Sequence, residues 1–208
     1  SLRQARQVLQ EFRADAVAGF GGYASAPLGY GAKQLKMPLT LQEQNSHAGL
    51  TNRLLSRWAH TVCAGYPNME AYFPQSQVVF TGNPVRTDIR PGHTPPATAK
   101  EFFGLDPQKP VVLSIGGSQG AKTLNDTLLS HLSHFEKADV QLLWQTGQLY
   151  WERIEQKLNT YHPRGIQAQQ FIYEMPQAYA AADVVISRAG ALSVSELALA
   201  EKPCLLVP

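Results

Sequence analysis

The stretch Val111 to Leu129, VVLSIGGSQGAKTLNDTLL, decides how this chain folds. Its β-branched opening, Val111–Ile115, predicts a buried strand, Gly116–Gly120 predict a turn, and the residues from Ala121 onward predict a helix. Glycines let an anion approach bare backbone, and the first N–H groups of a helix point at such a ligand. GGSQG matches neither the dinucleotide pattern G-x-G-x-x-G nor the P-loop, so the alternative is a tight turn that binds nothing.

The composition is that of an ordinary globular protein. The 208 residues are 44% hydrophobic and 16% charged, with a formal net charge of +2, which allows one large or two modest domains. No run of lysine and arginine forms a phosphate-tracking stripe, so nucleic acid is a poor candidate partner. No apolar run reaches the roughly 20 residues of a membrane helix, so any contact with a membrane is expected at its surface.

The cysteines and the two ends of the sequence give further expectations. Cys63 and Cys204 lie in apolar runs that predict core strands, which favours buried free thiols over a disulfide or a metal site. The chain opens in an amphipathic helix, Ser1–Phe12, without a starting methionine, and stops in the apolar segment Leu205–Pro208. We therefore expect a piece of a longer protein, with a partly exposed sheet edge or core where further segments would pack.

The strand, glycine turn and helix recur near the amino terminus. Ala16–Phe20 predict the strand, Gly21–Ser25 the turn, and Pro27–Lys36 the helix. Short apolar runs alternate with helical patterns along the rest of the chain, which favours parallel sheets covered by helices on both faces. The other predicted strands are Pro38–Leu41, Thr61–Ala64, Val78–Phe80, Val140–Gln145, Gln167–Phe171, Val184–Ser187 and Cys204–Val207, and further helices are predicted over residues 50–59 and 97–103.

A segment rich in proline and glycine, residues 90–98, separates the two α/β regions. It predicts a linker between Rossmann-like domains at 1–89 and 99–208. The loops at 171–175 and 187–196 follow predicted strands, and open parallel sheets bind ligands beyond the carboxyl ends of their strands. Two such halves predict a cleft for two phosphorylated ligands.

Five motifs make this prediction more specific: GFGGYASAP, LQEQNSHAGLTNR, GNPVRTD, GGSQGA and SRAGALSVSE, in this order. Together they resemble the bacterial N-acetylglucosaminyltransferases that make lipid II (the MurG type), over nearly the whole chain. The resemblance implies the GT-B fold, with both Rossmann-like domains present in part. It also implies inverting transfer of N-acetylglucosamine from UDP-N-acetylglucosamine to the C4 hydroxyl of the muramoyl sugar of lipid I, for peptidoglycan synthesis. The enzyme would be peripheral, at the cytoplasmic face of the bacterial cell membrane.

The resemblance implies donor-binding roles in the second half. Ser118 and Gln119 would meet the diphosphate and the sugar, and Arg86 would stabilise the charge on departing UDP. Glu196 would accept hydrogen bonds from both ribose hydroxyls, and Ile172 would lend backbone groups to uracil. The turn and helix start beneath the nucleotide would comprise Ala191, Leu192, Ser193, Val194 and Ser195.

Each of these residues also has a simpler interpretation. Taken alone, Arg86 closes a surface turn, Glu196 is a solvated residue in the first turn of a helix, and Ile172 is a core residue at the end of a strand. The family implies no required cofactor and no resident metal, with a divalent cation at most stimulatory. His131 and His134 have i, i+3 spacing on a predicted amphipathic helix, but no third metal ligand lies nearby in the sequence.

In the first half, the resemblance assigns the acceptor diphosphate to Gly21, Gly22, Tyr23 and Ser25, and a contact with the donor sugar to Asn45. The simpler interpretation of Asn45 is a loop asparagine that bonds its own backbone. Many relatives carry histidine where this chain has Gln42, so the chain departs from the family there.

The general base is expected outside this chain, on a glycine loop ending in histidine that would precede Ser1. A helix that helps to select the donor sugar would likewise follow Pro208. Within the chain, Glu43 is the only acidic residue in a suitable loop and is a weak candidate for the base. Two alternatives stay open: another GT-B enzyme that uses UDP-N-acetylglucosamine, such as a 2-epimerase or a glycolipid transferase, and a non-catalytic module that binds nucleotide sugars.

Overall fold

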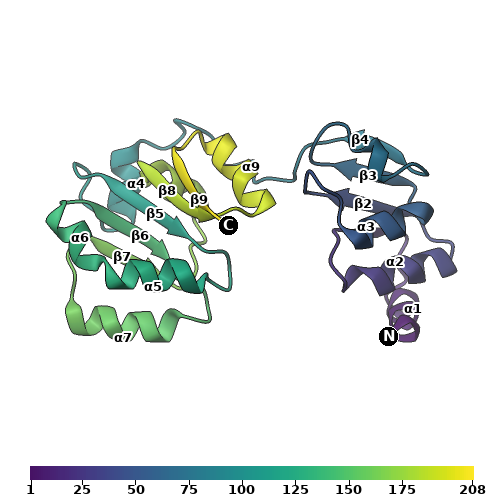
Figure 1. Cartoon of the computed structure of the whole chain (residues 1–208), viewed down its shortest axis with the longest axis horizontal. Helices are drawn as coiled ribbons and strands as arrows, with labels where there is room; N and C mark the ends of the chain where they lie inside the picture. Colours follow the sequence, from purple (N-terminus) through teal and green to yellow (C-terminus); the bar gives the residue numbers. More distant parts are fainter. The chain divides into compact units, whose positions relative to one another are not determined.

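The computed structural model describes residues 1–208 and divides them into two compact units, Ser1–Pro84 and Val85–Pro208. Each unit has its own parallel sheet, with strands and helices alternating along the chain (Figure 1). The division falls a few residues before the expected linker at 90–98. Ile89 explains this position, because its side chain is buried in the core of the second unit beside Ala99.

The first unit has four parallel strands in the order β1-β2-β3-β4. The side chains of Leu39, Leu41 and Glu43 alternate onto the buried face of β2, next to Val62 and Ala64 of β3. The elements are α1 (Leu2–Phe12), β1 (Val17–Gly19), α2 (Ser25–Gln34), β2 (Leu39–Glu43), α3 (Leu50–Leu55), β3 (Thr61–Ala64) and β4 (Gln77–Phe80), with 3₁₀ helices at Ser56–Trp58 and Glu70–Tyr72.

The second unit has five parallel strands in the order β7-β6-β5-β8-β9. Counted within the unit, the order is 3-2-1-4-5, which is that of a doubly wound Rossmann sheet with its switch point between β5 and β8. The strands are β5 (Val111–Ile115), β6 (Gln141–Gln145), β7 (Ile166–Gln169), β8 (Val184–Arg188) and β9 (Cys204–Val207). The helices are α4 (Pro96–Phe102), α5 (Lys122–Ser130), α6 (Leu132–Lys137), α7 (Trp151–Tyr161), α8 (Met175–Ala181) and α9 (Ala191–Ala200).

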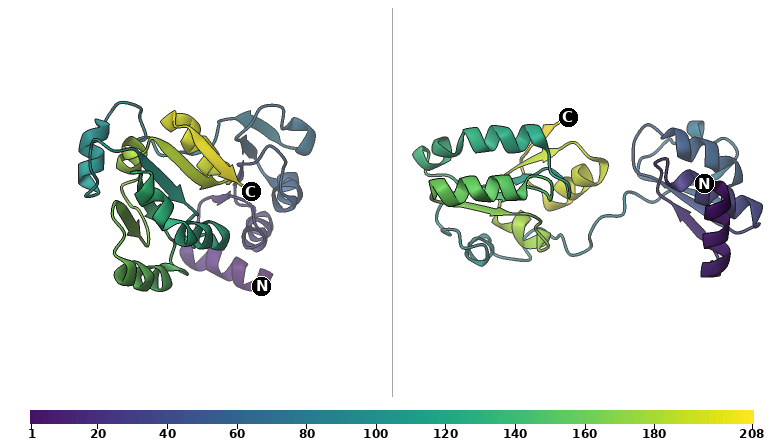
Figure 2. Two further views of the ribbon diagram at one scale, coloured as in Figure 1. Left: turned by 60° about the vertical axis from the view of Figure 1, so that its left-hand side comes forward. Right: turned by 90° about the horizontal axis from the view of Figure 1, so that it is seen from below.

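Both faces of the second sheet are covered, as predicted. Leu113 of β5 packs in one cluster with side chains of α4, α8 and α9. Trp144 of β6 packs in another cluster with side chains of α5, α6 and α7. Helices α5 and α7 run side by side over this second cluster (Figure 2).

Some local predictions are wrong. Strand β2 continues to Glu43, beyond the predicted end at Leu41, because Glu43 falls on the buried face of the strand. The helix predicted through His131 is two helices that break at this residue, so the two histidines do not share one continuous helix. None of the helices has the length and apolarity needed to cross a bilayer.

The cysteines are both free, as predicted, but they are not both buried. Cys63 is half-buried and Cys204 is exposed. Cys204 lies on β9, which pairs only with β8 and forms an edge of the sheet. The same strand leaves Leu205 59% exposed, so an exposed sheet edge is present at β9.

Candidate functional site

The glycine turn of the second unit joins β5 to α5, as the sequence predicts. Gly117 and Gly120 have φ angles of 82° and 85°, a conformation that favours glycine. Ser118 and Gln119 are exposed on the turn. No side chain caps the start of α5, so no side-chain acceptor occupies the first N–H groups of this helix. The turn therefore offers a hydroxyl, an amide and backbone donors to an anion.

Close backbone packing fixes this turn against the end of β6. A Cβ atom on Gly120 would lie 2.2 Å from the carbonyl oxygen of Thr146, and one on Gly147 would lie 2.0 Å from the nitrogen of Gly120. Asn125 Nδ2 donates to the same Thr146 oxygen over 2.7 Å. Only glycines permit this approach, and the sequence analysis did not single out Gly147.

Gln145, the buried last residue of β6, connects the glycine turn to the loop after β7. Its Nε2 donates to the carbonyl oxygen of Gly117 over 3.1 Å, and its Oε1 accepts from the N–H of Ile172 over 3.0 Å. Ile172 itself is fully buried, and its N–H is already bonded. The sequence reasoning missed Gln145, although a glutamine that ends the apolar strand QLLWQ is a signal of a buried polar role.

Arg86 and Glu196 meet beside this loop. The distance from Arg86 Nε to Glu196 Oε1 is 3.7 Å, and Arg86 Nη1 donates to the carbonyl oxygen of Tyr173 over 3.4 Å. Tyr179 Oη donates to Glu196 Oε2 over 3.1 Å. Burial raises the pKa of the Tyr179 phenol, and the neighbouring Glu196 raises this pKa further. The phenol therefore stays a donor at neutral pH.

Glu196 is not the solvated first-turn residue that its simpler interpretation expects. It is the sixth residue of α9 and so lies in the second turn of the helix, with only 20% of its side chain exposed. The preceding residues, Ala191–Ser195, form the helix start as predicted, after Gly190 in an extended conformation. Arg86 likewise does more than close a surface turn, because it contacts both α9 and the loop after β7.

A cavity of about 270 Å³ lies where the glycine turn faces the loop after β8. This is the switch point of the sheet, where Rossmann folds bind their ligands. The predicted donor residues Ser118 and Gln119, Ile172, and Ala191–Glu196 follow β5, β7 and β8, so they lie at the carboxyl ends of these strands, although none of them lines the cavity itself. The cavity is lined by Gly116, Gly120, Ala121, Arg188, Ala189, Gly190 and Pro208.

The glycine turn of the first unit is also placed as predicted, between β1 and α2. Gly21 and Gly22 have φ angles of 82° and 75°, and Ser25 Oγ donates to the carbonyl oxygen of Gly22 over 3.0 Å. The Tyr23 side chain is 94% exposed. The four residues Gly21, Gly22, Tyr23 and Ser25 thus form one accessible turn at a helix start.

Glu43 is not a loop residue, contrary to the sequence prediction. It ends β2 with only 1% of its surface exposed. Its carboxylate accepts from Asn45 N at 3.1 Å and from Asn45 Nδ2, Gly49 N and Asn52 Nδ2 at 3.0 Å each. A general base needs an oxygen that a hydroxyl can reach, and both of these oxygens are engaged. This geometry supports a role in holding the 45–49 loop.

Three further positions have hydrogen-bond partners within the chain. Asn45 is exposed on the loop and its side chain is bonded to Glu43, while Gln42 Nε2 donates to the carbonyl oxygen of Gly82 over 3.4 Å. His131 Nδ1 lies 2.8 Å from the carbonyl oxygen of Thr127. The structure contains no group of three or more His, Cys, Asp or Glu residues that could hold a metal ion.

Two models of one family match this chain. The glycosyltransferase family 28 N-terminal domain matches residues 1–64, and the glycosyltransferase family 28 C-terminal domain matches residues 111–208. The UDP-N-acetylglucosamine–N-acetylmuramyl-(pentapeptide) pyrophosphoryl-undecaprenol N-acetylglucosamine transferase of Parabacteroides distasonis is 46% identical over 100% of this chain and 56% of its own length. The chain thus spans about half the length of the curated relatives it matches.

Solved structures share the fold. The crystal structure of Acinetobacter baumannii MurG is 35% identical, with a TM-score of 0.63 over 100% of this chain and 56% of that chain. A UDP-GlcNAc 2-epimerase from Neisseria meningitidis has a TM-score of 0.70 over 99% of this chain and 62% of that chain, at 15% identity. At this low identity, the second likeness shows the fold alone.

Proposed function

The chain belongs to glycosyltransferase family 28, and on that premise we propose that it transfers N-acetylglucosamine from UDP-N-acetylglucosamine to the C4 hydroxyl of the muramoyl sugar of lipid I. The predicted fold class, GT-B with two partial Rossmann-like units, is confirmed. The product would be lipid II for peptidoglycan. Support for these substrates comes from the names of the curated relatives and from the site in the second unit.

One observation carries the proposal: hydrogen bonds and an ion pair connect the glycine turn, the loop after β7 and helix α9. Gln145 ties the glycine turn to Ile172, and Arg86 ties the next residue, Tyr173, to Glu196. The turn would hold the diphosphate with Ser118 and Gln119. Glu196 would accept from the vicinal ribose hydroxyls, because a carboxylate has two oxygens with free lone pairs to offer. Uracil would lie at Ile172, whose N–H is already bonded to Gln145 and whose carbonyl group is the proposed acceptor.

The chemistry assigned to Arg86 is leaving-group stabilisation. The C4 hydroxyl oxygen forms a bond to the anomeric carbon while the bond from that carbon to the β-phosphate oxygen breaks. The electron pair leaves with UDP, and the hydroxyl proton passes to a base. The guanidinium of Arg86 would move from Glu196 towards the diphosphate and balance this charge, so we propose that no cofactor is required and that a divalent cation at most stimulates.

The first unit would supply the acceptor side. Gly21, Gly22, Tyr23 and Ser25 form an accessible turn at the start of α2, which suits the diphosphate of a lipid acceptor. Asn45 would contact the donor sugar from the 45–49 loop. Because the acceptor is a lipid, the enzyme would work peripherally at the cytoplasmic face of the cell membrane. We assign no base within this chain, because the Glu43 carboxylate is engaged by four donors.

Calorimetric titration with UDP-N-acetylglucosamine, UDP-glucose and UDP tests the donor site. Glu196→Ala should weaken binding by about tenfold or more, since hydrogen bonds to a charged group contribute about 1.5–3 kcal/mol. The control is Glu152→Ala, which removes an exposed carboxylate from α7 and should change nothing. A folded chain that binds none of these nucleotides, or an equal loss in both variants, would contradict the proposed donor site.

Turnover then separates the enzyme classes. With a lipid I analogue present, consumption of UDP-N-acetylglucosamine with formation of a glycosylated lipid supports the proposed reaction. Consumption of the nucleotide sugar without the lipid would instead favour a 2-epimerase. Binding without consumption under either condition would favour a non-catalytic module.

A further inference from the structure

The carboxylate of Glu196 is held from one side by a buried tyrosine. Tyr179 lies on α8 and only 2% of its surface is exposed. Its hydroxyl donates to Glu196 Oε2 over 3.1 Å, while the weaker contact with Arg86 is made by Oε1. Each carboxylate oxygen has a second lone pair, so neither contact exhausts the carboxylate as an acceptor. The open lone pairs fit a ligand that brings two hydroxyl donors.

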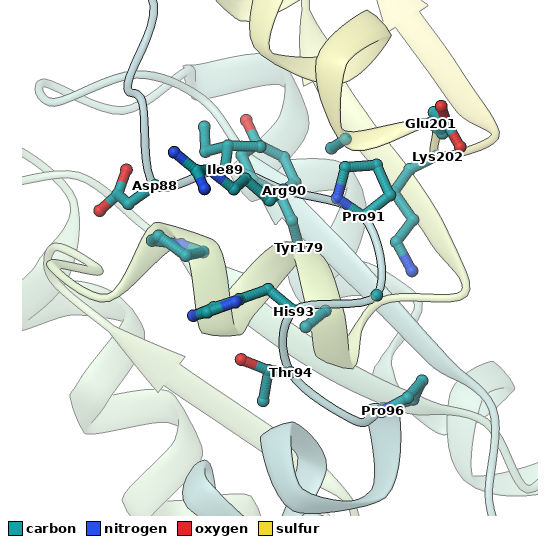
Figure 3. Close-up of a pocket in the computed structure, with 14 residues that line it drawn as sticks. Asp88, Ile89, Arg90, Pro91, His93, Thr94, Pro96, Tyr179, Glu201 and Lys202 are labelled. Carbon is teal, nitrogen blue, oxygen red and sulfur yellow. The ribbon is translucent and has the colours of Figure 1, made fainter.

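The ring of Tyr179 packs against the core of the second unit and lies next to residues 88–96. It packs in the same core cluster as Ile89 and Ala200. It also lines a cavity of about 190 Å³ beneath residues 88–96, where Figure 3 shows the ring next to Ile89 and Arg90. The core contacts place the ring so that its hydroxyl reaches α9. Glutamate, by contrast, has three side-chain torsions and a broad terminal one, so its carboxylate plane needs an external restraint.

We propose that Tyr179 is a positioning residue that orients the Glu196 carboxylate towards the two ribose hydroxyls of the bound nucleotide. This inference rests on the proposed function, in which Glu196 binds the ribose. Tyr179 touches no substrate group itself. Its raised pKa agrees with the role, because a phenol that stays protonated always donates to the carboxylate and never competes with it for the ribose protons.

The test compares UDP with 2′,3′-dideoxy-UDP, which lacks both ribose hydroxyls. Affinities are measured for the unaltered chain, Tyr179→Phe, Glu196→Ala and the double variant. Tyr179→Phe should weaken UDP binding about fivefold, the size of one ordinary hydrogen bond. It should leave the binding of the dideoxy nucleotide unchanged. In the Glu196→Ala background it should have no further effect on UDP, because the group that it positions is absent.

The chain offers a matched control. Tyr161 Oη donates to Glu136 Oε2 over 2.6 Å, on helices α7 and α6, and Tyr161→Phe removes this second tyrosine–glutamate bond. It should leave both nucleotide affinities unchanged. A thermal melt of each variant verifies that the fold is intact.

Other results would overturn the inference, and they show whether the proposed donor site fails with it. Equal loss of UDP and dideoxy-UDP in Tyr179→Phe would overturn the inference, because the effect would then not involve the ribose. A normal UDP affinity in Tyr179→Phe alongside weak binding by Glu196→Ala would also overturn it, while leaving the proposed donor site intact. If Glu196→Ala binds UDP normally, both the ribose role of Glu196 and the role of Tyr179 fail.

Discussion

The two glycine turns, Gly21–Gly22 after β1 and Gly116–Gly120 after β5, arise from the same local pattern but lie in different surroundings. β1 is an edge strand with β2 as its one neighbour, whereas β5 lies between β6 and β8. A Cβ atom added at Gly22 would meet nothing within 4 Å, whereas one added at Gly120 would clash with the backbone of Thr146 and Gly147, directly after β6. In this chain neighbouring backbone therefore encloses the second turn, and the first turn is open at Gly22.

The polar side chains around the two turns differ in the same way. Gln145 reaches the second turn from the neighbouring strand and also bonds the loop after β7. Near the first turn, Asn52 Nδ2 donates to the carbonyl oxygen of Gln42 and to Glu43, but its Oδ1 is buried without a partner. Side-chain hydrogen bonds thus connect the second turn to several elements. The hydrogen bonds near the first turn leave one buried oxygen, Asn52 Oδ1, without a partner.

The largest expected effect is that of Gly120→Ala. The new Cβ would lie 2.2 Å from the carbonyl oxygen of Thr146, at a φ angle of 85°, so the turn must move away from the residues that follow β6. We expect a loss of about 3 kcal/mol or more in the free energy of unfolding, measured by urea denaturation, together with loss of nucleotide binding. Gly22→Ala is the matched control: it has the same backbone strain but open space, and should lose about 1 kcal/mol. Equal losses would remove the distinction between the turns.

An intermediate effect is expected from Gln145→Met. The substitution keeps the volume but leaves the buried N–H of Ile172 and the carbonyl of Gly117 without partners, at a cost of about 2–3 kcal/mol. Asn52→Leu in the first unit should cost only about 1–2 kcal/mol, because it also removes an unpaired buried oxygen. Hydrogen exchange of the Ile172 N–H and urea denaturation measure the two losses. A greater loss for Asn52→Leu would reverse the comparison.

The smallest effect concerns alkaline stability and the contact of α8 with α9. The pKa of Tyr179 is raised in the folded state, so its contribution to stability is complete below the unfolded pKa of about 10 and is lost as the pH rises beyond it. Unfolding free energies of the unaltered chain should fall more steeply above about pH 10 than those of Tyr179→Phe, by about 1 kcal/mol per pH unit. Parallel profiles of the two proteins would show that folding does not raise the pKa of Tyr179.

Much of the fold was predictable from local pattern. Apolar runs rich in β-branched residues predicted β5 and β3 at their observed bounds, because a glycine, Gly116 or Gly65, directly follows each run and marks its end. The errors occur where burial depends on neighbours. Glu43 was expected in a loop because it lies in the polar run 42–47, and Cys204 was expected in the core because its surroundings are apolar.

The sequence predicted the residues of the candidate site that are exposed or lie in motifs. It did not predict the residues that support them. Ser118 and Glu196 lie in recognisable motifs. Gln145, Gly147 and Tyr179 support such residues from other elements, and only the place of Gln145 at the end of an apolar strand hints at this role. A partner that lies far away along the chain leaves no periodic signal.

Local patterns in the sequence were enough to predict two strand–glycine–helix units, their parallel sheets and the family to which the chain belongs, because hydrophobic period, turn chemistry and ordered motifs are local properties. Only the three-dimensional structure shows that β5 lies between β6 and β8, that Glu43 faces inward, and that Tyr179 reaches Glu196. These outcomes depend on strand order and on the packing of α8 against the rest of its unit. Such contacts join residues that the sequence separates, so no local pattern encodes them.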